Sequence, residues 1–108
     1  MPSQIQVIEK HPDAALLFSD FDFTDELSGD TSLNAGTSTV TAVDAGGTAA
    51  ASVVGTVSIS GMKLRAILQA GTNGQDYLIT FKAVGTTTAH VAVKQVEMRV
   101  RTKVTGAL

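Results

Sequence analysis

The stretch MKLRAILQAGTNGQDYLITFKA, residues 62–83, decides the fold class. Within residues 62–69, every second side chain is apolar: Met62, Leu64, Ala66 and Leu68. Residues 76–83 repeat this alternation with Tyr77, Ile79, Phe81 and Ala83. A period of two is typical of a strand with one buried face. The glycine-rich residues 70–74 between the two segments predict a turn.

Working outward from this stretch, further segments have the composition of short strands. They are residues 15–23, 31–34, 37–43, 48–54, 56–60 and 88–104. Gly55 interrupts one apolar run and predicts a bulge or bend. The apolar face of the last segment switches near Lys94-Gln95, which predicts a second bulge or break, because a one-residue slip flips every side chain. Seven or eight short strands at this spacing indicate an antiparallel β-sandwich or barrel.

Two details of the N-terminal half follow from the same pattern. Alternation from Leu17 onward places Phe21 and Phe23 on the buried face and Phe18 on the opposite one. Residues 24–27 predict a single helical turn, with Thr24 as its cap and acidic residues in the first turn. Ahead of these, residues 1–13 contain two prolines and predict an extended arm that either pairs as an edge strand or reaches a neighbouring molecule.

Length and composition agree with one small all-β domain. The chain has 108 residues, with 14 Thr, 14 Ala, 12 Val and 10 Gly but only 2 Pro and no Trp. Thr and Val are β-branched residues that favour strands. A chain of this size forms one core, which we expect to span residues 14–108 behind the arm.

The net charge of −2 conceals a split along the chain. Residues 1–44 carry a net charge of −7 and residues 45–108 a net charge of +5. Two candidate interaction surfaces follow, one acidic (Asp20, Asp22, Asp25, Glu26, Asp30) and one basic (Lys94, Arg99, Arg101, Lys103). Complementary faces of this kind predict self-association in a symmetric array. The charge balance excludes a uniformly basic nucleic-acid binder, and we expect no sequence-specific nucleic-acid partner.

Catalytic and metal-binding patterns are missing from the sequence. The chain has no cysteine and only two histidines, His11 and His90, and it contains no nucleotide-binding or serine-hydrolase motif. We therefore expect no enzyme activity, no cofactor and no metal. No apolar stretch approaches the about 20 residues of a membrane-spanning helix, and the N-terminus does not have the pattern of a signal peptide. We expect no membrane partner.

Tyr77 lies three residues after Gly74, the last glycine of the glycine-rich turn. In the pattern Gly74-x-x-Tyr77 the tyrosine opens a strand directly after a tight turn. A tyrosine at that position can fold back so that its hydroxyl contacts the backbone of the turn, as in the tyrosine corner of immunoglobulin-like sandwiches. We predict this structural role for Tyr77 and Gly74.

The order of short motifs resembles a known family of phage proteins. The chain has His11-Pro12-Asp13, then Asp20 with Phe21, then Leu27 and Gly29-Asp30, and later Gly71-Thr72-Asn73-Gly74 with Tyr77. This order is similar to that of the phage fibre–tail adaptor proteins, small virion proteins of tailed bacteriophages, over residues 10–101. Three places depart from the family pattern: His11, the aromatic pair Phe21 and Phe23, and Ala70.

The resemblance implies an immunoglobulin-like sandwich with a structural role in the virion. It implies an adaptor or connector at the head–tail or tail–fibre region, assembled in the host cytoplasm. The implied partners are portal or adaptor proteins, tail or fibre proteins, or the major capsid protein. Two alternatives stay open at this point: a capsid decoration protein, and a carbohydrate- or receptor-binding module.

Overall fold

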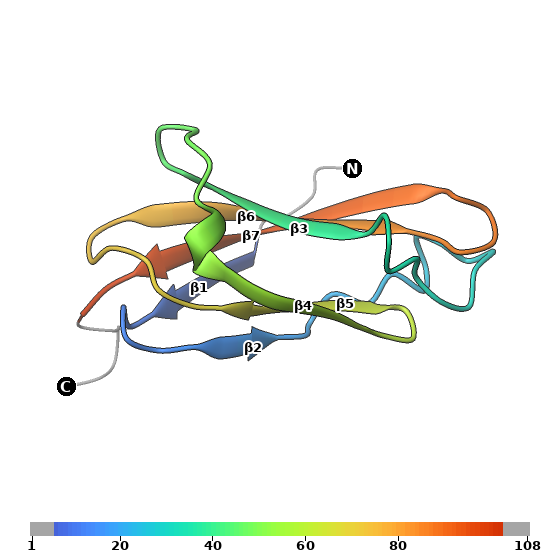
Figure 1. Ribbon diagram of the computed structural model, residues 1–108, viewed down its shortest axis with the longest axis horizontal. Coiled ribbons are helices and arrows are strands. Elements are labelled where there is room, and N and C mark those ends of the chain that lie inside the picture. Colours follow the sequence, from blue (N-terminus) through green and yellow to red (C-terminus); the bar gives the residue numbers. More distant parts are fainter. Residues whose placement is uncertain (1–5, 103–108) are drawn as a thin grey trace.

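The computed structural model describes residues 6–102, which form a two-layer β-sandwich (Figure 1). One sheet has four strands in the order β1-β7-β6-β3, and the other has three in the order β2-β5-β4. The strands are β1 (Gln6–Lys10), β2 (Leu16–Phe18), β3 (Thr39–Asp44), β4 (Val54–Ser60), β5 (Lys63–Leu68), β6 (Asp76–Val84) and β7 (Val91–Val100). The predicted all-β sandwich is confirmed, whereas its immunoglobulin-like detail stays a prediction. Among the described residues, no helix has the length and apolar character needed to cross a membrane.

The core lies between the two sheets and is built from the alternating faces seen in the sequence. Tyr77, Ile79, Phe81 and Ala83 of β6 are buried, as are Leu64, Ala66 and Leu68 of β5. β6 pairs with β7 over nine residues, which brings Val96, Met98 and Val100 onto the same buried face. Alternation in these central strands therefore predicts their buried faces correctly.

β1 pairs with β7 in parallel, while the other ladders between strands are antiparallel. Its register places Ile8 opposite Met98 and Lys10 opposite Val100. Residues 6–10 of the predicted arm therefore form an edge strand, and residues 1–5 lie outside the described part of the chain. The boundary predicted after residue 13 stays a prediction.

The predicted placement of Phe18 on the face opposite the core was wrong. Phe18 is the last residue of β2, and its side chain lies in the core. Phe18 is only 6% exposed, whereas Leu17 is 52% exposed. Beyond Phe18 the chain leaves the strand, so the alternation restarts and Phe21 and Phe23 return to the core. The ring of Phe21 lies 5.0 Å from that of Phe18 and 5.0 Å from that of Phe81, between centroids. Packing of three aromatic rings sets these orientations.

The predicted bulge near Lys94-Gln95 was also wrong. The register between β6 and β7 runs without interruption from Val84 opposite Val91 to Asp76 opposite Arg99. Val93 is 55% exposed on the outer face, and Lys94 takes the inward position. The apolar switch in the sequence reflects exposed valines at the start of β7 and leaves the strand regular.

Two further strand predictions do not hold. Residues 31–34 contribute only an isolated bridge between Leu33 and Gly85. Residues 48–54 contain a bridge from Ala49 to Val43 and a 3-10 turn, η1 (Ala51–Val53). This turn carries the chain from the four-stranded sheet into the three-stranded sheet (Figure 1). By contrast the bulge at Gly55 is confirmed, since the register between β4 and β5 shifts between Val54 and Val57.

Candidate interaction surfaces

Asp22, in the predicted acidic surface, holds the turn that follows it. Its carboxylate accepts a hydrogen bond from the backbone N–H of Thr24 at 2.9 Å and another from the Thr24 hydroxyl. These bonds, above all the one from the hydroxyl, lower the pKa of Asp22. The predicted turn forms, with the Leu27 N–H bonded to the Phe23 carbonyl at 2.9 Å. The predicted cap, Thr24, is wrong. The carboxylate of Asp22 caps the turn, and Thr24 donates the hydrogen bonds to it.

Asp30 lies buried between two loops. Its carboxylate accepts hydrogen bonds from the N–H of Thr87 at 2.7 Å, the N–H of Thr88 at 3.0 Å and the Thr88 hydroxyl at 2.6 Å. The Thr88 hydroxyl is the largest cause of a lowered pKa at Asp30. Gly85 lies so close that an added Cβ would be 2.1 Å from Asp30 Oδ2. Asp30 therefore joins its own loop to residues 57 and 58 positions later in the chain, and its carboxylate is occupied by partners within the molecule.

Lys94 brings the acidic and basic halves of the sequence together within one molecule. Its Nζ lies 3.3 Å from Glu26 Oε2 and donates to the Asp22 carbonyl at 3.1 Å. The ammonium also sits 5.1 Å from the centre of the Phe23 ring, within range of a cation–π contact. Part of the charge complementarity predicted between molecules is thus used inside the chain.

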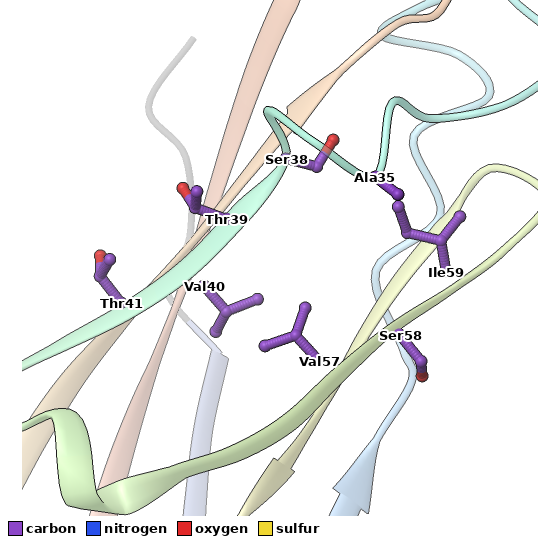
Figure 2. Close-up of a pocket in the computed structure, with 8 residues that line it drawn as sticks. All are labelled: Ala35, Ser38, Thr39, Val40, Thr41, Val57, Ser58 and Ile59. Carbon is purple, nitrogen blue, oxygen red and sulfur yellow. The ribbon is translucent and has the colours of Figure 1, made fainter.

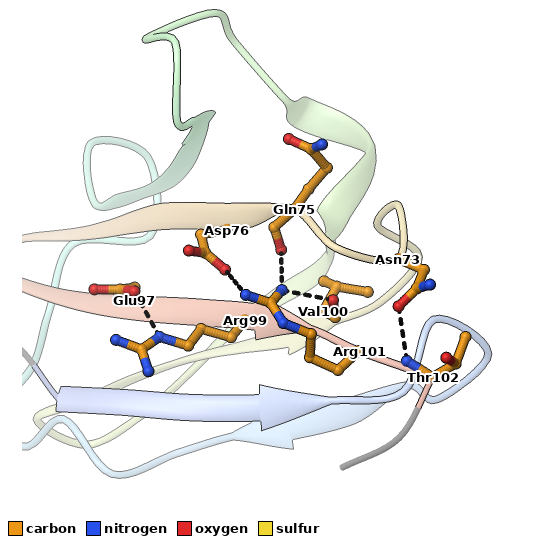
Figure 3. A network of polar contacts seen from close by, with 8 residues as sticks. All are labelled: Asn73, Gln75, Asp76, Glu97, Arg99, Val100, Arg101 and Thr102. Carbon is orange, nitrogen blue, oxygen red and sulfur yellow. Dashed lines mark hydrogen bonds and ion pairs between the residues drawn. The ribbon is translucent and has the colours of Figure 1, made fainter. Parts of the chain in front are cut away.

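The basic residues at the end of β7 form a second internal network (Figure 3). Arg101 donates to Asp76 Oδ1 at 2.8 Å and to the carbonyls of Gln75 and Val100 at 3.2 and 2.8 Å. Arg99 donates to Glu97 Oε2 at 2.8 Å. This network fastens the end of β7 to the start of β6. Lys103, the fourth predicted basic residue, lies outside the described residues.

Tyr77 folds back onto the turn before it. Its hydroxyl accepts a hydrogen bond from the backbone N–H of Thr72 at 3.0 Å, and its side chain is buried. Gly74 has a φ of 89°, a conformation that glycine adopts without strain, and its N–H bonds to the Val100 carbonyl at 2.8 Å. Turn, tyrosine and the end of β7 therefore form one hydrogen-bonded unit.

Lys10 is a structural residue that sequence reasoning missed. Its side chain is almost fully buried, and Nζ donates to the carbonyls of His11 at 2.7 Å and Ala14 at 2.9 Å. Burial lowers its pKa, while the charge of Asp13 acts in the opposite direction. The ammonium shapes the His11-Pro12-Asp13 turn. The sequence did hold a signal for this role: Lys10 is a lone lysine that ends a segment with apolar residues and precedes the His11-Pro12 turn.

A groove between β3 and β4 was also missed (Figure 2). It has a volume of about 540 Å³, and its apolar lining includes Val40, Val57 and Ile59. A second hollow of about 340 Å³ shares Val40, Thr41 and Val57 with it. The available signal was the alanine run at residues 49–51, which weakens strand propensity where the chain changes sheets.

Among residues 6–102, no cluster of three or more His, Cys, Asp or Glu side chains is placed to hold a metal ion. What the described residues offer instead is a β-sandwich with loops pinned by side chains, a groove and charged edges. These features offer surfaces through which the sandwich can contact other molecules.

Comparison with known protein families identifies the family to which this chain belongs. The family model for the podophage GP4 fiber-tail adaptor protein gp77 matches residues 10–102. The chain belongs to this family, so it is a bacteriophage structural protein of the tail-adaptor type and a component of the virion. This is not an enzyme class. Searches of curated proteins and of solved structures found no match.

Proposed function

We propose that the protein joins the tail of the phage particle to its fibres, as a non-enzymatic adaptor added during assembly in the host cytoplasm. The observation that carries this proposal is the family match over residues 10–102, which covers nearly all of the described sandwich. The motif residues inside that match, such as Asp30 and Tyr77, hold loops in place and so preserve the shape of the contact surfaces.

The contacts with tail and fibre proteins are proposed to use the charged side chains that remain exposed. On the acidic side they include Asp20 and Asp25, at the segment that follows β2, whereas the equally exposed Asp22 and Glu26 have partners within the chain. Lys63 and Lys82 supply exposed positive charge on β5 and β6. Lys94, Arg99 and Arg101 are partly neutralised by partners within the chain, so we expect them to contribute less. Exposed charges at a rim mainly set the rate and specificity of docking.

Particles produced without this protein test the proposal. We expect them to carry tails without attached fibres, visible by electron microscopy of the purified particles. Particles with a normal set of fibres would contradict the tail–fibre placement.

A reconstruction of the intact virion tests the same placement directly. Density of this sandwich between tail and fibre would support the proposal. Density on the capsid lattice would instead indicate a decoration protein, and density between head and tail would move the adaptor to the other junction. Clear binding on a glycan array, with or without calcium, would favour a carbohydrate-binding module and count against a purely structural role.

A further inference from the structure

The groove between β3 and β4 lies where the two sheets leave the sandwich open. Val40 and Val57 point toward each other across it, one from each sheet (Figure 2). Val57 occupies an inward position opposite Ala66, which is fully buried, yet Val57 itself is 40% exposed. Apolar surface that belongs to the core is therefore exposed along this side.

Both strands that flank the groove are sheet edges. Among the described residues, β3 pairs with β6 apart from one bridge at Val43, and β4 pairs with β5. On the outer edge of β3 the Ala42 carbonyl and the Asp44 N–H are bonded to residues 48–50, whereas within the described residues no strand pairs with β3 ahead of Ala42 or with the outer edge of β4. An open edge beside an apolar groove accepts an added extended strand, with backbone bonds supplying affinity and pockets supplying selectivity.

The lining of the groove limits what that strand can be. None of the residues that line either hollow carries a charge. A charged side chain would have to be buried there without a partner, which is unfavourable. The occupant must therefore be an uncharged extended segment with apolar side chains at every second or fourth position.

We propose that this occupant is the segment of residues 104–108 of a second copy of the chain. Residues 104–108 (VTGAL) carry no charged side chain, and Val104 and Leu108 fall on the same face of an extended strand. Five extended residues reach about 17 Å, enough to run along the outer edge of β3. Residues 1–5 fit less well, since Pro2 cannot donate a backbone hydrogen bond.

The resulting contact joins different surfaces of the two molecules. Such head-to-tail contacts generate rings when the rotation closes and open filaments when it does not. The inference concerns contact between copies and stands apart from the proposed fibre attachment. If it fails, the adaptor role is unaffected.

Cysteine cross-linking tests the proposal cleanly, because the chain has no cysteine of its own. One variant carries Val57→Cys and stops after Thr102, and so offers only a groove. The other carries Val104→Cys and Val40→Arg, and so offers only a C-terminal segment. The two purified proteins are mixed under mild oxidation. A control mixture uses Lys82→Cys in place of Val57→Cys, on the exposed outer face of β6.

We expect a disulfide-linked heterodimer from the Val57→Cys mixture and only background linkage from the Lys82→Cys control. Equal yields in the two mixtures would overturn the proposal. A single chain carrying both Val57→Cys and Val104→Cys distinguishes the remaining case. Closure within one molecule at every protein concentration would show that the groove takes its own C-terminal segment, which also overturns a contact between copies.

A matched pair of substitutions provides a second test. Val57→Lys places an ammonium in the groove and should weaken self-association of the full chain by about tenfold or more. Val93→Lys makes the same change on the exposed outer face of β7 and should leave self-association unchanged. Sedimentation equilibrium measures both, and circular dichroism shows that each variant is folded. Equal effects of the two substitutions would contradict the proposed site.

Discussion

Asp30 illustrates how a single side chain connects distant parts of this chain. Its carboxylate accepts three hydrogen bonds from Thr87 and Thr88, and Gly85 approaches it too closely for any side chain. Tyr77 does the same for the turn at residues 70–74 through its bond from Thr72. Buried polar groups of this kind stabilise a fold only while every partner is present.

Acid should weaken the contact made by Asp30. Hydrogen bonds, above all the one from the Thr88 hydroxyl, lower the pKa of Asp30 in the folded protein, whereas an aspartate in the unfolded chain has a pKa of about 3.9. The stabilisation is therefore present above that value and is lost as the pH falls through the folded pKa. Urea unfolding at a series of pH values measures it. Asp30→Asn should flatten the acid dependence relative to Asp25→Asn, a control at an exposed position.

Gly85→Ala should destabilise the protein by about 1–3 kcal/mol, because the added methyl group overlaps the Asp30 carboxylate. Gly46→Ala is the matched control, since its Cβ would meet Asp44 Oδ1 at an ordinary 3.4 Å. Denaturant unfolding of both variants measures the difference. Equal stability of the two would show that the loops at residues 30 and 85 separate easily.

Tyr77→Phe removes one hydroxyl and leaves the Thr72 N–H without its acceptor. We expect a loss of about 1 kcal/mol in the free energy of unfolding, the usual contribution of one such hydrogen bond. Thermal and denaturant unfolding measure the loss. A variant as stable as the parent would count against a tyrosine corner at this position.

At the scale of elements, β7 organises the four-stranded sheet. It pairs with β6 on one side and with β1 on the other. Its inward positions include both apolar side chains and Lys94, whose ammonium reaches Glu26 and the Phe23 ring. A lysine serves at an inward position because its aliphatic stem covers apolar surface while its charge stays near the rim.

Because β7 is continuous, substitutions at its inward and outward positions should differ in their effect on stability. Met98→Ala removes a fully buried side chain and should cost about 2–5 kcal/mol. Val93→Ala changes an exposed side chain and should stay within about 0.5 kcal/mol. Urea unfolding compares the two variants. A large loss from Val93→Ala would indicate the bulged strand that the sequence pattern had favoured.

At the scale of the whole molecule, the sandwich combines basic side chains that are paired within the chain with an exposed apolar groove between β3 and β4. The ion pairs of Lys94 and Arg101 lie within the chain, and the groove between β3 and β4 has no charged lining. Each of these features supports a different proposed form of self-association. One uses the remaining exposed charges, and the other uses the groove.

Salt distinguishes the two forms. Contacts between exposed charges weaken as the screening length falls to about 3 Å at about 1 M salt. Contact through an uncharged groove is not screened, so we expect association to persist at that salt concentration. Light scattering across a salt series measures this. Dissociation at high salt would favour the complementary charged faces instead of the groove.

Strand alternation, glycine positions and composition were enough to predict an all-β sandwich or barrel, the buried faces of β5 and β6, and the bulge or bend at Gly55. These features are local, because a period of two and a glycine in a strand depend on neighbouring residues. Motif order was enough to indicate the family.

The inward turn of Phe18, the regular course of β7, the parallel pairing of β1 and the groove depend on the assembled sandwich. So do the internal partners of Asp30, which lie 57 and 58 residues away in the chain, and those of Lys94, which lie 68–72 residues away. Alternation reports which side chains share a face and says nothing of which strand or loop meets that face. Those pairings are chosen by packing and hydrogen bonding between segments that the sequence does not place side by side.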